Sequence, residues 1–200
     1  MLSNTKRFTL EEYHRLIDLR FFAEGDRIEL VRGEIVQMAP KTTSHVFCSR
    51  SLLDELPSLL QGRAKFQCQD PILLPSGSEP EPDFVIINPK PDNYLSGHPT
   101  PADILLVIEV ADSSLDYDQT VKAELYAEAG ISNYWLFNLV DYRLEAYSEP
   151  YKDFQGEYGY AQRKYILAER SAPLPFAPDA PSLDLSKVFP RLVDYQSFGT

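Results

Sequence analysis

The chain has 200 residues, of which 44% are hydrophobic and 24% are charged, and its formal net charge is −11. This length and composition are typical of one soluble α/β domain with its own core. No apolar run approaches the roughly 20 residues that cross a bilayer, and the first residues lack the apolar centre of a secretory signal. We therefore expect a cytoplasmic protein with no membrane partner. The acidic balance disfavours tight, unaided binding of duplex DNA, because affinity for phosphates comes largely from Lys and Arg.

The metal-binding residue types are few. Only Cys48, Cys68 and three widely spaced histidines are present. These exclude a disulfide framework and a thiolate zinc site, and they make a site built from histidines improbable. Any metal should therefore be a hard cation held by oxygen, such as Mg²⁺ or Mn²⁺.

The first third of the chain predicts a helix, a hairpin and a second helix. Thr9 and Glu12 form a capping box, which opens an amphipathic helix from about 9 to 20. The segment RIELVRGEIVQM predicts a β-hairpin that turns at Arg32-Gly33 and places Glu29 and Glu34 on one side. An apolar stripe predicts the second helix over about 44–61, bent or interrupted at Pro57.

The middle of the chain alternates strands with turns. KFQCQDPILL is strand-like, DFVII at 83–87 is an apolar strand, and a Pro- and Gly-rich loop follows. ILLVIEVA at 104–111 is typical of a central strand. A helix is expected over about 116–129, ended by Gly130, and NYWLFNL, RLEAYSE and YAQRKYIL predict three more strands before SLDLSKVF closes the domain. We expect one mixed α/β domain over residues 1–200, with its core at about 8–190.

Two acidic residues and one lysine form the candidate catalytic set. Asp83 opens one apolar strand, Glu109 lies near the end of the next, and Lys122 falls on the helix that follows. Two carboxylates can hold a divalent cation against a phosphodiester, and an ammonium group can orient the attacking water or offset developing charge. The backbone carbonyl of Val110 is expected to complete the metal's ligands.

Each of these residues also has a plainer explanation. Asp83 can simply begin a strand after a turn, and Glu109 can be the solvated end of its strand. Lys122 has a partner of opposite charge four residues earlier on the helix, Asp118, in a pair that stabilises a helix by roughly 0.2–0.5 kcal/mol. The arrangement of all three residues is more informative than any one of them.

The order of these motifs resembles the PD-(D/E)XK nuclease superfamily and, more closely, the Uma-two family of bacterial restriction endonucleases. The matching stretches are ELVRGEIVQM at 29–38, His45 at the start of the second helix, EPDFVII at 81–87, SLDLSKVF at 182–189 and, most specifically, 103–139. The resemblance implies a restriction-endonuclease-like core, with a mixed central sheet flanked by helices and preceded by the N-terminal helix and hairpin. It also implies a Mg²⁺- or Mn²⁺-dependent endonuclease that hydrolyses phosphodiester bonds in DNA, with Asp83 and Glu109 as metal ligands.

Two positions depart from the superfamily's plainest pattern. Ala111 stands where the lysine is expected, two residues after the glutamate, and the family takes its lysine from the segment Tyr117, Asp118 and Lys122 instead. Asn138 stands where aspartate is expected after the Tyr-Trp strand, a change that bears on stability or partner contacts more than on metal binding.

Further residues are candidate accessory members of the site. A hairpin carboxylate, Glu29 or Glu34, can bind a second metal or position water, although a solvated hairpin face is the simpler interpretation. His45 can donate to a phosphate or serve only as a hydrogen-bonded residue near a helix start, and Gln69 is a weaker candidate. Aromatic residues Tyr126, Tyr134 and Trp135 are expected in the core or at a subunit interface rather than as a platform for bases.

Two other functions remain open from the sequence. The chain can keep the nuclease fold but bind nucleic acid or protein without cutting, which its acidic surface favours. It can also be an assembly subunit in which the acidic residues have lost their catalytic role. A homodimer fits every interpretation, because two-fold symmetry suits cleavage of both strands of a duplex.

Overall fold

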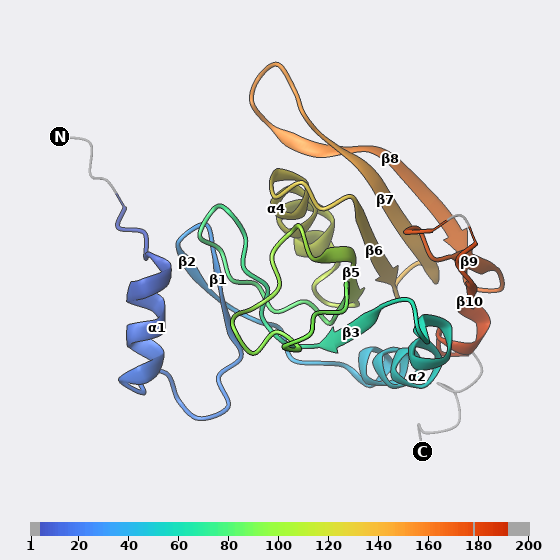
Figure 1. Cartoon of the computed structure of the whole chain (residues 1–200), viewed down its shortest axis with the longest axis horizontal. Helices are drawn as coiled ribbons and strands as arrows, with labels where there is room; N and C mark the ends of the chain where they lie inside the picture. Colours follow the sequence, from blue (N-terminus) through green and yellow to red (C-terminus); the bar gives the residue numbers. More distant parts are fainter. Residues whose placement is uncertain (1–4, 178, 192–200) are drawn as a thin grey trace.

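A six-stranded mixed sheet forms the centre of the molecule (Figure 1), in a computed structural model that describes residues 5–177 and 179–191. The strand order is β3-β4-β5-β6-β7-β8, antiparallel throughout except for the parallel β5–β6 pair. The strands are β3 (Lys65–Cys68), β4 (Phe84–Ile87), β5 (Ile104–Ala111), β6 (Asn133–Asn138), β7 (Arg143–Lys152) and β8 (Tyr158–Leu167).

Both faces of this sheet are covered, which explains why its central strands are apolar on both sides. Helix α2 (Thr43–Leu60) packs on one face together with β9 (Ser171–Pro173), β10 (Ser182–Asp184) and the 3₁₀ turn η2 (Leu185–Lys187). The other face carries α3 (Leu115–Tyr117), the π-helical segment η1 (Asp118–Lys122) and α4 (Ala123–Glu128). Along β5, Ile108 and Val110 face α2, whereas Val107 and Ala111 face α4. Strand alternation therefore turns Glu109 toward α4.

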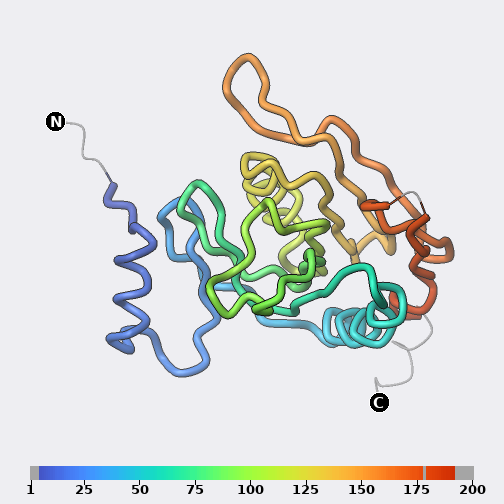
Figure 2. Tube along the Cα trace, in the orientation of Figure 1, coloured from blue at the N-terminus to red at the C-terminus, as the bar shows by residue number. Residues whose placement is uncertain are grey.

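The N-terminal hairpin lies beside the α4 face. Its strands β1 (Ile28–Val31) and β2 (Glu34–Gln37) pair Val31 with Glu34 and Glu29 with Val36, as the sequence predicted. Arg32 and Gly33 both have positive φ, as a tight hairpin turn requires. Helix α1 (Leu10–Asp18) begins at the predicted capping box and lies beyond the hairpin, at the end of the molecule opposite β9 and β10 (Figures 1 and 2).

Arg32 fastens this hairpin to α4. Its guanidinium lies 3.0 Å from Glu124 and 2.7 Å from Glu128, two carboxylates that are adjacent on one helix face. This link joins residues that are more than 90 positions apart and fixes the hairpin turn against α4, the helix that directly follows Lys122.

Two sequence predictions need correction. Helix α2 continues through Pro57 to Leu60, so the predicted interruption does not occur; Leu56 and Leu60, buried on either side, hold the last turn against the sheet. The helix expected over 116–129 is divided by the π-helical turn η1 into two short α-helical parts. Gly130 does end the second part, with φ +75°.

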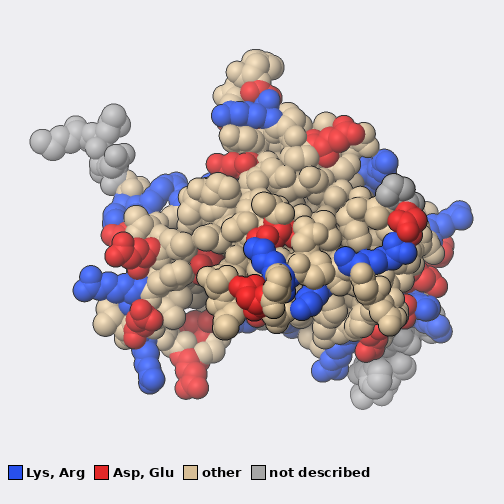
Figure 3. All heavy atoms as spheres, viewed as in Figure 1, with Lys and Arg blue, Asp and Glu red and all other residues tan. Residues whose placement is uncertain are grey.

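The surface shows no large patch of one charge on the face drawn in Figure 3, where Lys and Arg are interspersed with Asp and Glu. In the described part of the chain, no helix has the length and apolar character needed to span a bilayer.

Replacement of Ile108 by alanine tests the packing beneath β5. Ile108 is fully buried against α2, so Ile108→Ala is expected to lower the free energy of unfolding by about 2–5 kcal/mol in urea titrations. The matched control is Leu95→Ala, at a side chain that is 92% exposed, which should change stability by less than about 0.5 kcal/mol. Equal effects of the two substitutions would contradict this description of the core.

Candidate active site

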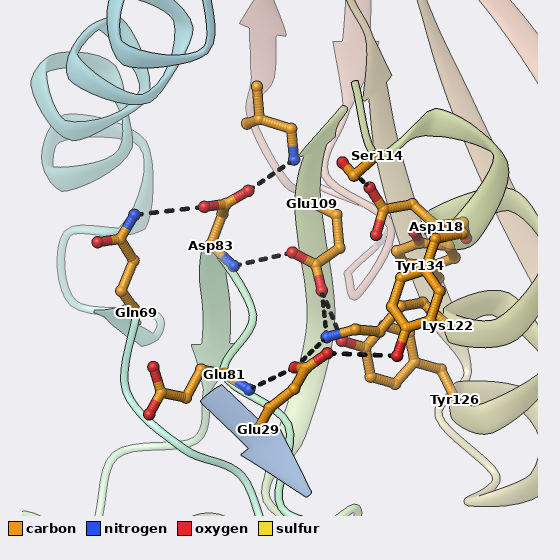
Figure 4. Close-up of polar contacts among 12 residues, drawn as sticks. Glu29, Gln69, Glu81, Asp83, Glu109, Ser114, Asp118, Lys122, Tyr126 and Tyr134 are labelled. Carbon is orange, nitrogen blue, oxygen red and sulfur yellow. Dashed lines mark hydrogen bonds and ion pairs between the residues drawn. The ribbon is translucent and has the colours of Figure 1, made fainter. Parts of the chain in front are cut away.

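The register of two antiparallel strands brings the candidate carboxylates together. Phe84 of β4 pairs with Ile108 of β5, so the next position outward places Asp83 opposite Glu109. The backbone N–H of Asp83 donates to Glu109 Oε2 at 3.0 Å, and the N–H of Val110 donates to Asp83 Oδ2 at 2.9 Å (Figure 4). Two hydrogen bonds thus join Asp83, just before β4, to residues 26 and 27 positions later in β5.

Asp83 is held as a carboxylate by several donors. His45 Nε2 lies 3.0 Å from Oδ2, and Gln69 Nε2 donates to Oδ1 at 3.3 Å. Burial raises the pKa of Asp83, but the hydrogen bond and charge of His45, with the donors Val110 and Gln69, outweigh it and lower the pKa below its ordinary value. Two predicted accessory residues, His45 and Gln69, therefore contact a predicted catalytic residue directly.

Glu109 is in the opposite electrostatic situation. Its Oε1 accepts the hydroxyl of Tyr126 at 2.6 Å and lies 3.4 Å from Lys122 Nζ. Burial raises the pKa of Glu109 to about 7, against the lowering effect of Lys122, and the charge of Asp83 adds to the rise. Asp83 and Glu109 are therefore neighbours whose pKa values are shifted in opposite directions, a pattern found at catalytic sites.

Lys122 places its ammonium group between two carboxylates. Its Nζ lies 2.6 Å from Glu29 Oε2 and 3.4 Å from Glu109 Oε1, and the side chain is buried (Figure 4). Burial disfavours the charged amine, but Glu109 and Glu29 outweigh it and raise the pKa of Lys122 above its ordinary value. Lys122 therefore stays protonated at neutral pH and serves as a donor rather than a base.

The suggested pairing of Lys122 with Asp118 on the helix surface is wrong. Both residues belong to η1, where the extra residue of a π turn replaces the α-helical spacing on which such a pair depends. Asp118 instead accepts the hydroxyl of Ser114 at 2.6 Å. Burial and the charge of Glu109 raise the pKa of Asp118 well above its ordinary value.

The two hairpin glutamates have different surroundings. Glu29 is 1% exposed and contacts Lys122, the backbone N–H of Glu81 and the hydroxyl of Tyr117. Glu34, next to the turn, is exposed and pairs with Arg7 at 2.9 Å. It does not line the cavity that Glu29 and Lys122 line. The structure thus brings Glu29 to the site and leaves Glu34 outside it.

A buried carboxylate on β7 holds the π-helical segment from behind. Glu145 is fully buried, and Gln119 Nε2 donates to its Oε1 and Oε2 at 3.0 and 3.1 Å. Asn138 donates to Glu145 at 2.8 Å and to Asp141 at 3.0 Å, so aspartate here would remove both hydrogen bonds and place a third carboxylate beside these two. The other donors to Glu145 are Tyr147, Arg143 and Arg163.

Three aromatic residues divide between the core and the site. Tyr126, Tyr134 and Trp135 are all buried, as predicted for core residues. The Tyr126 hydroxyl contacts Glu109, and this role was missed although Tyr126 follows Lys122 by four positions and shares its helix face. The Tyr134 hydroxyl donates to the carbonyl of Asp118 at 3.1 Å, which fixes η1 to β6.

These side chains surround one cavity of about 280 Å³. Its polar lining includes five of the predicted residues, Glu29, His45, Asp83, Glu109 and Lys122, together with Asp118. Four carboxylates are buried here with one buried ammonium, and a hard cation bound among them would favour their ionised forms.

The donor chemistry of this cavity fits Mg²⁺ or Mn²⁺. Asp83 and Glu109 offer adjacent carboxylates, and Val110 also lines the cavity, although its carbonyl as a ligand stays a prediction. Within residues 5–177 and 179–191, no three His, Cys, Asp or Glu side chains are grouped so as to hold a metal alone. The remaining ligands would come from water, the backbone or a bound phosphate, as is usual for Mg²⁺.

A mixed sheet with two strand carboxylates and a helical lysine at one cavity defines a restriction-endonuclease-like protein. The model of the Uma2 family, described as “Putative restriction endonuclease”, matches residues 10–186, so the chain belongs to that family. The fold is similar to a crystal structure of “a putative nuclease belonging to DUF820 from Anabaena variabilis ATCC 29413”. The two are 15% identical, with a TM-score of 0.66 over 91% of this chain and 97% of the other. No curated protein matches the chain.

The raised pKa of Glu109 predicts how stability depends on pH. The folded protein holds a proton at about pH 4.5–7 that the unfolded chain has lost, so this contribution is complete below pH 4.5 and is lost as pH rises through about 7. The free energy of unfolding should therefore fall between pH 5 and pH 8, and Glu109→Gln should flatten that fall. Glu34→Gln, outside the cavity, is the control and should leave it in place. A fall that Glu109→Gln leaves unchanged would contradict the assignment.

Proposed function

We propose that the chain is a divalent-cation-dependent endonuclease that hydrolyses phosphodiester bonds in DNA. The observation that carries this proposal is the convergence of Asp83, Glu109 and Lys122 on one cavity. Asp83 directly precedes β4, Glu109 belongs to β5 and Lys122 to η1, and Glu109 contacts Asp83 at 3.0 Å and Lys122 at 3.4 Å. Membership of the Uma2 family supports the same class of activity.

Asp83 and Glu109 are the residues that would hold the cation. Asp83 is kept ionised by His45, Val110 and Gln69, so it is ready to act as a ligand without first losing a proton. Burial and the charge of Asp83 raise the affinity of Glu109 for a proton, and a bound cation would take the place of that proton. When bound, Mg²⁺ or Mn²⁺ supplies Lewis-acid stabilisation of the charge on the scissile phosphate.

Lys122 and its partners have a different part in the reaction. The ammonium group is already desolvated and fixed by Glu29, so its position need not change as charge develops on the phosphate. Because Lys122 remains protonated, it orients water or phosphate oxygen by donating a hydrogen bond. His45 holds Asp83 in place through Nε2 while its own Nδ1 lies 3.3 Å from Ser49.

The substrate is expected to be DNA, and a homodimer would present two such sites to the two strands of a duplex.

Cleavage assays with Asp83→Ala test the proposal. Purified protein with Mg²⁺ or Mn²⁺ should cut at least one of single-stranded, duplex or branched DNA, and EDTA should stop it. Asp83→Ala should lower the rate at least ~100-fold, because it removes a cation ligand at the reacting phosphate.

The matched control is Glu34→Gln, which changes an exposed carboxylate of the same fold. It should cleave at the wild-type rate. Cation binding without cleavage of any of these DNA forms would sink the proposal and favour a protein that binds nucleic acid through the nuclease fold.

A further inference from the structure

Two cationic side chains at the rim of the cavity have no carboxylate partner. Arg27 precedes β1 and Lys41 precedes α2, and both line the cavity that contains Asp83 and Glu109. Among the described residues, neither side chain makes an ion pair or hydrogen bond, whereas Arg32 and Lys122 are fully engaged. Burial and the charge of Arg27 lower the pKa of Lys41, which agrees with two like charges held near each other.

A second hollow continues from this rim along α2. It shares Lys41 and Thr42 with the cavity and extends past Phe47 and Arg50 as far as Asp54. Phe47 is 43% exposed, and Arg50, three residues later on the same helix face, is also exposed. The two hollows together form a path with cations along it and one exposed aromatic ring.

This arrangement is suited to an anionic chain. Arg27 and Lys41 are like charges near each other, and the nearest carboxylates, Glu81 for Arg27 and Asp83 for Lys41, act on them only from beyond ion-pair distance. An anion bound beside the two cations would therefore lower the free energy. The chain has a net charge of −11, so its affinity for phosphate must come from a local set of cations. An exposed aromatic ring beside cations is how proteins hold unpaired bases, since stacking on it requires a free base face.

We propose that a single strand of nucleic acid leaves the cavity along the first half of α2. The phosphates next to the scissile one contact Arg27 and Lys41, a further phosphate contacts Arg50, and an unpaired base stacks on Phe47. This inference rests on the proposed function, because it takes the cavity to hold the scissile phosphate, and it adds the form of the substrate and the direction of its path.

Equilibrium binding without cleavage tests this path. Fluorescence polarisation of a labelled deoxythymidine oligonucleotide, measured in EDTA over a series of salt concentrations, reports affinity independently of catalysis. Arg27→Gln, Lys41→Gln and Arg50→Gln should each weaken binding about 5- to 10-fold and reduce the slope of log affinity against log salt by about 0.7. Phe47→Leu should weaken binding about tenfold with the slope unchanged.

Lys164→Gln is the matched control, because it removes the same charge from an exposed residue of β8, away from the cavity. It should bind like the wild type, and circular dichroism should show all variants folded. Equal losses in Lys164→Gln, no losses in the other variants, or equal affinity of the wild type for a duplex of the same length would overturn the inference.

The outcomes separate the two proposals. Weakened binding in the path variants, with no cleavage by the wild type in Mg²⁺ or Mn²⁺, would leave the binding path in place and remove the nuclease activity. Cleavage by the wild type with unchanged affinity in the variants would remove the path alone. A wild-type protein that binds no oligonucleotide overturns the path, whatever the cleavage assay shows.

Discussion

The ammonium group of Lys122 is buried between the carboxylates of Glu29 and Glu109, and the rest of the site is arranged around that contact. Removing these charges from water costs several kcal/mol per ion, which is offset only when the geometry is good and the remaining atoms are hydrogen-bonded. The remaining polar atoms are hydrogen-bonded in this protein: among the described residues, no buried side-chain nitrogen or oxygen lacks a hydrogen-bond partner. The site is thus a complete polar network inside an apolar fold.

This network imposes requirements on elements that are distant in the sequence. The hairpin must bring Glu29 to the α4 face, and the contacts of Arg32 with α4 hold it there. The segment η1 must aim Lys122 at the sheet, and it is held by Gln119 on Glu145 and by its own carbonyl on Tyr134. The register of β4 with β5 fixes Asp83, just before β4, opposite Glu109 of β5. Rigid elements with such supporting contacts keep catalytic groups within the narrow tolerance that reaction geometry demands.

Much of this arrangement could be predicted from the sequence, because it follows from local patterns. Alternation and apolar runs identified the hairpin and the strands of Asp83 and Glu109, and the capping box identified the start of α1. The order of carboxylate, carboxylate and lysine was enough to suggest the cluster. Fold class and family membership were both confirmed.

Other features depend on tertiary contacts that no local pattern contains. A π turn changes the apolar spacing of 115–128 too little to be recognised, and its stability depends on Glu145, which comes from β7. The pairing of Lys122 with Asp118, offered as the plainer explanation of this lysine, is therefore wrong. Likewise, a hairpin pattern puts Glu29 and Glu34 on one side of the hairpin. It does not say which of the two glutamates the rest of the fold covers. Pro57 was expected to bend or interrupt its helix, and packing holds the helix together through that position.

The claim on which the function depends is that the cavity accepts a divalent cation at Asp83 and Glu109. A crystal soaked in Mn²⁺ and measured for anomalous scattering tests this claim directly. The account predicts an anomalous peak within ligand distance of both carboxylates, with the Glu109 side chain released from the N–H of Asp83. Crystals that show full manganese occupancy elsewhere and no peak between these two residues would contradict it.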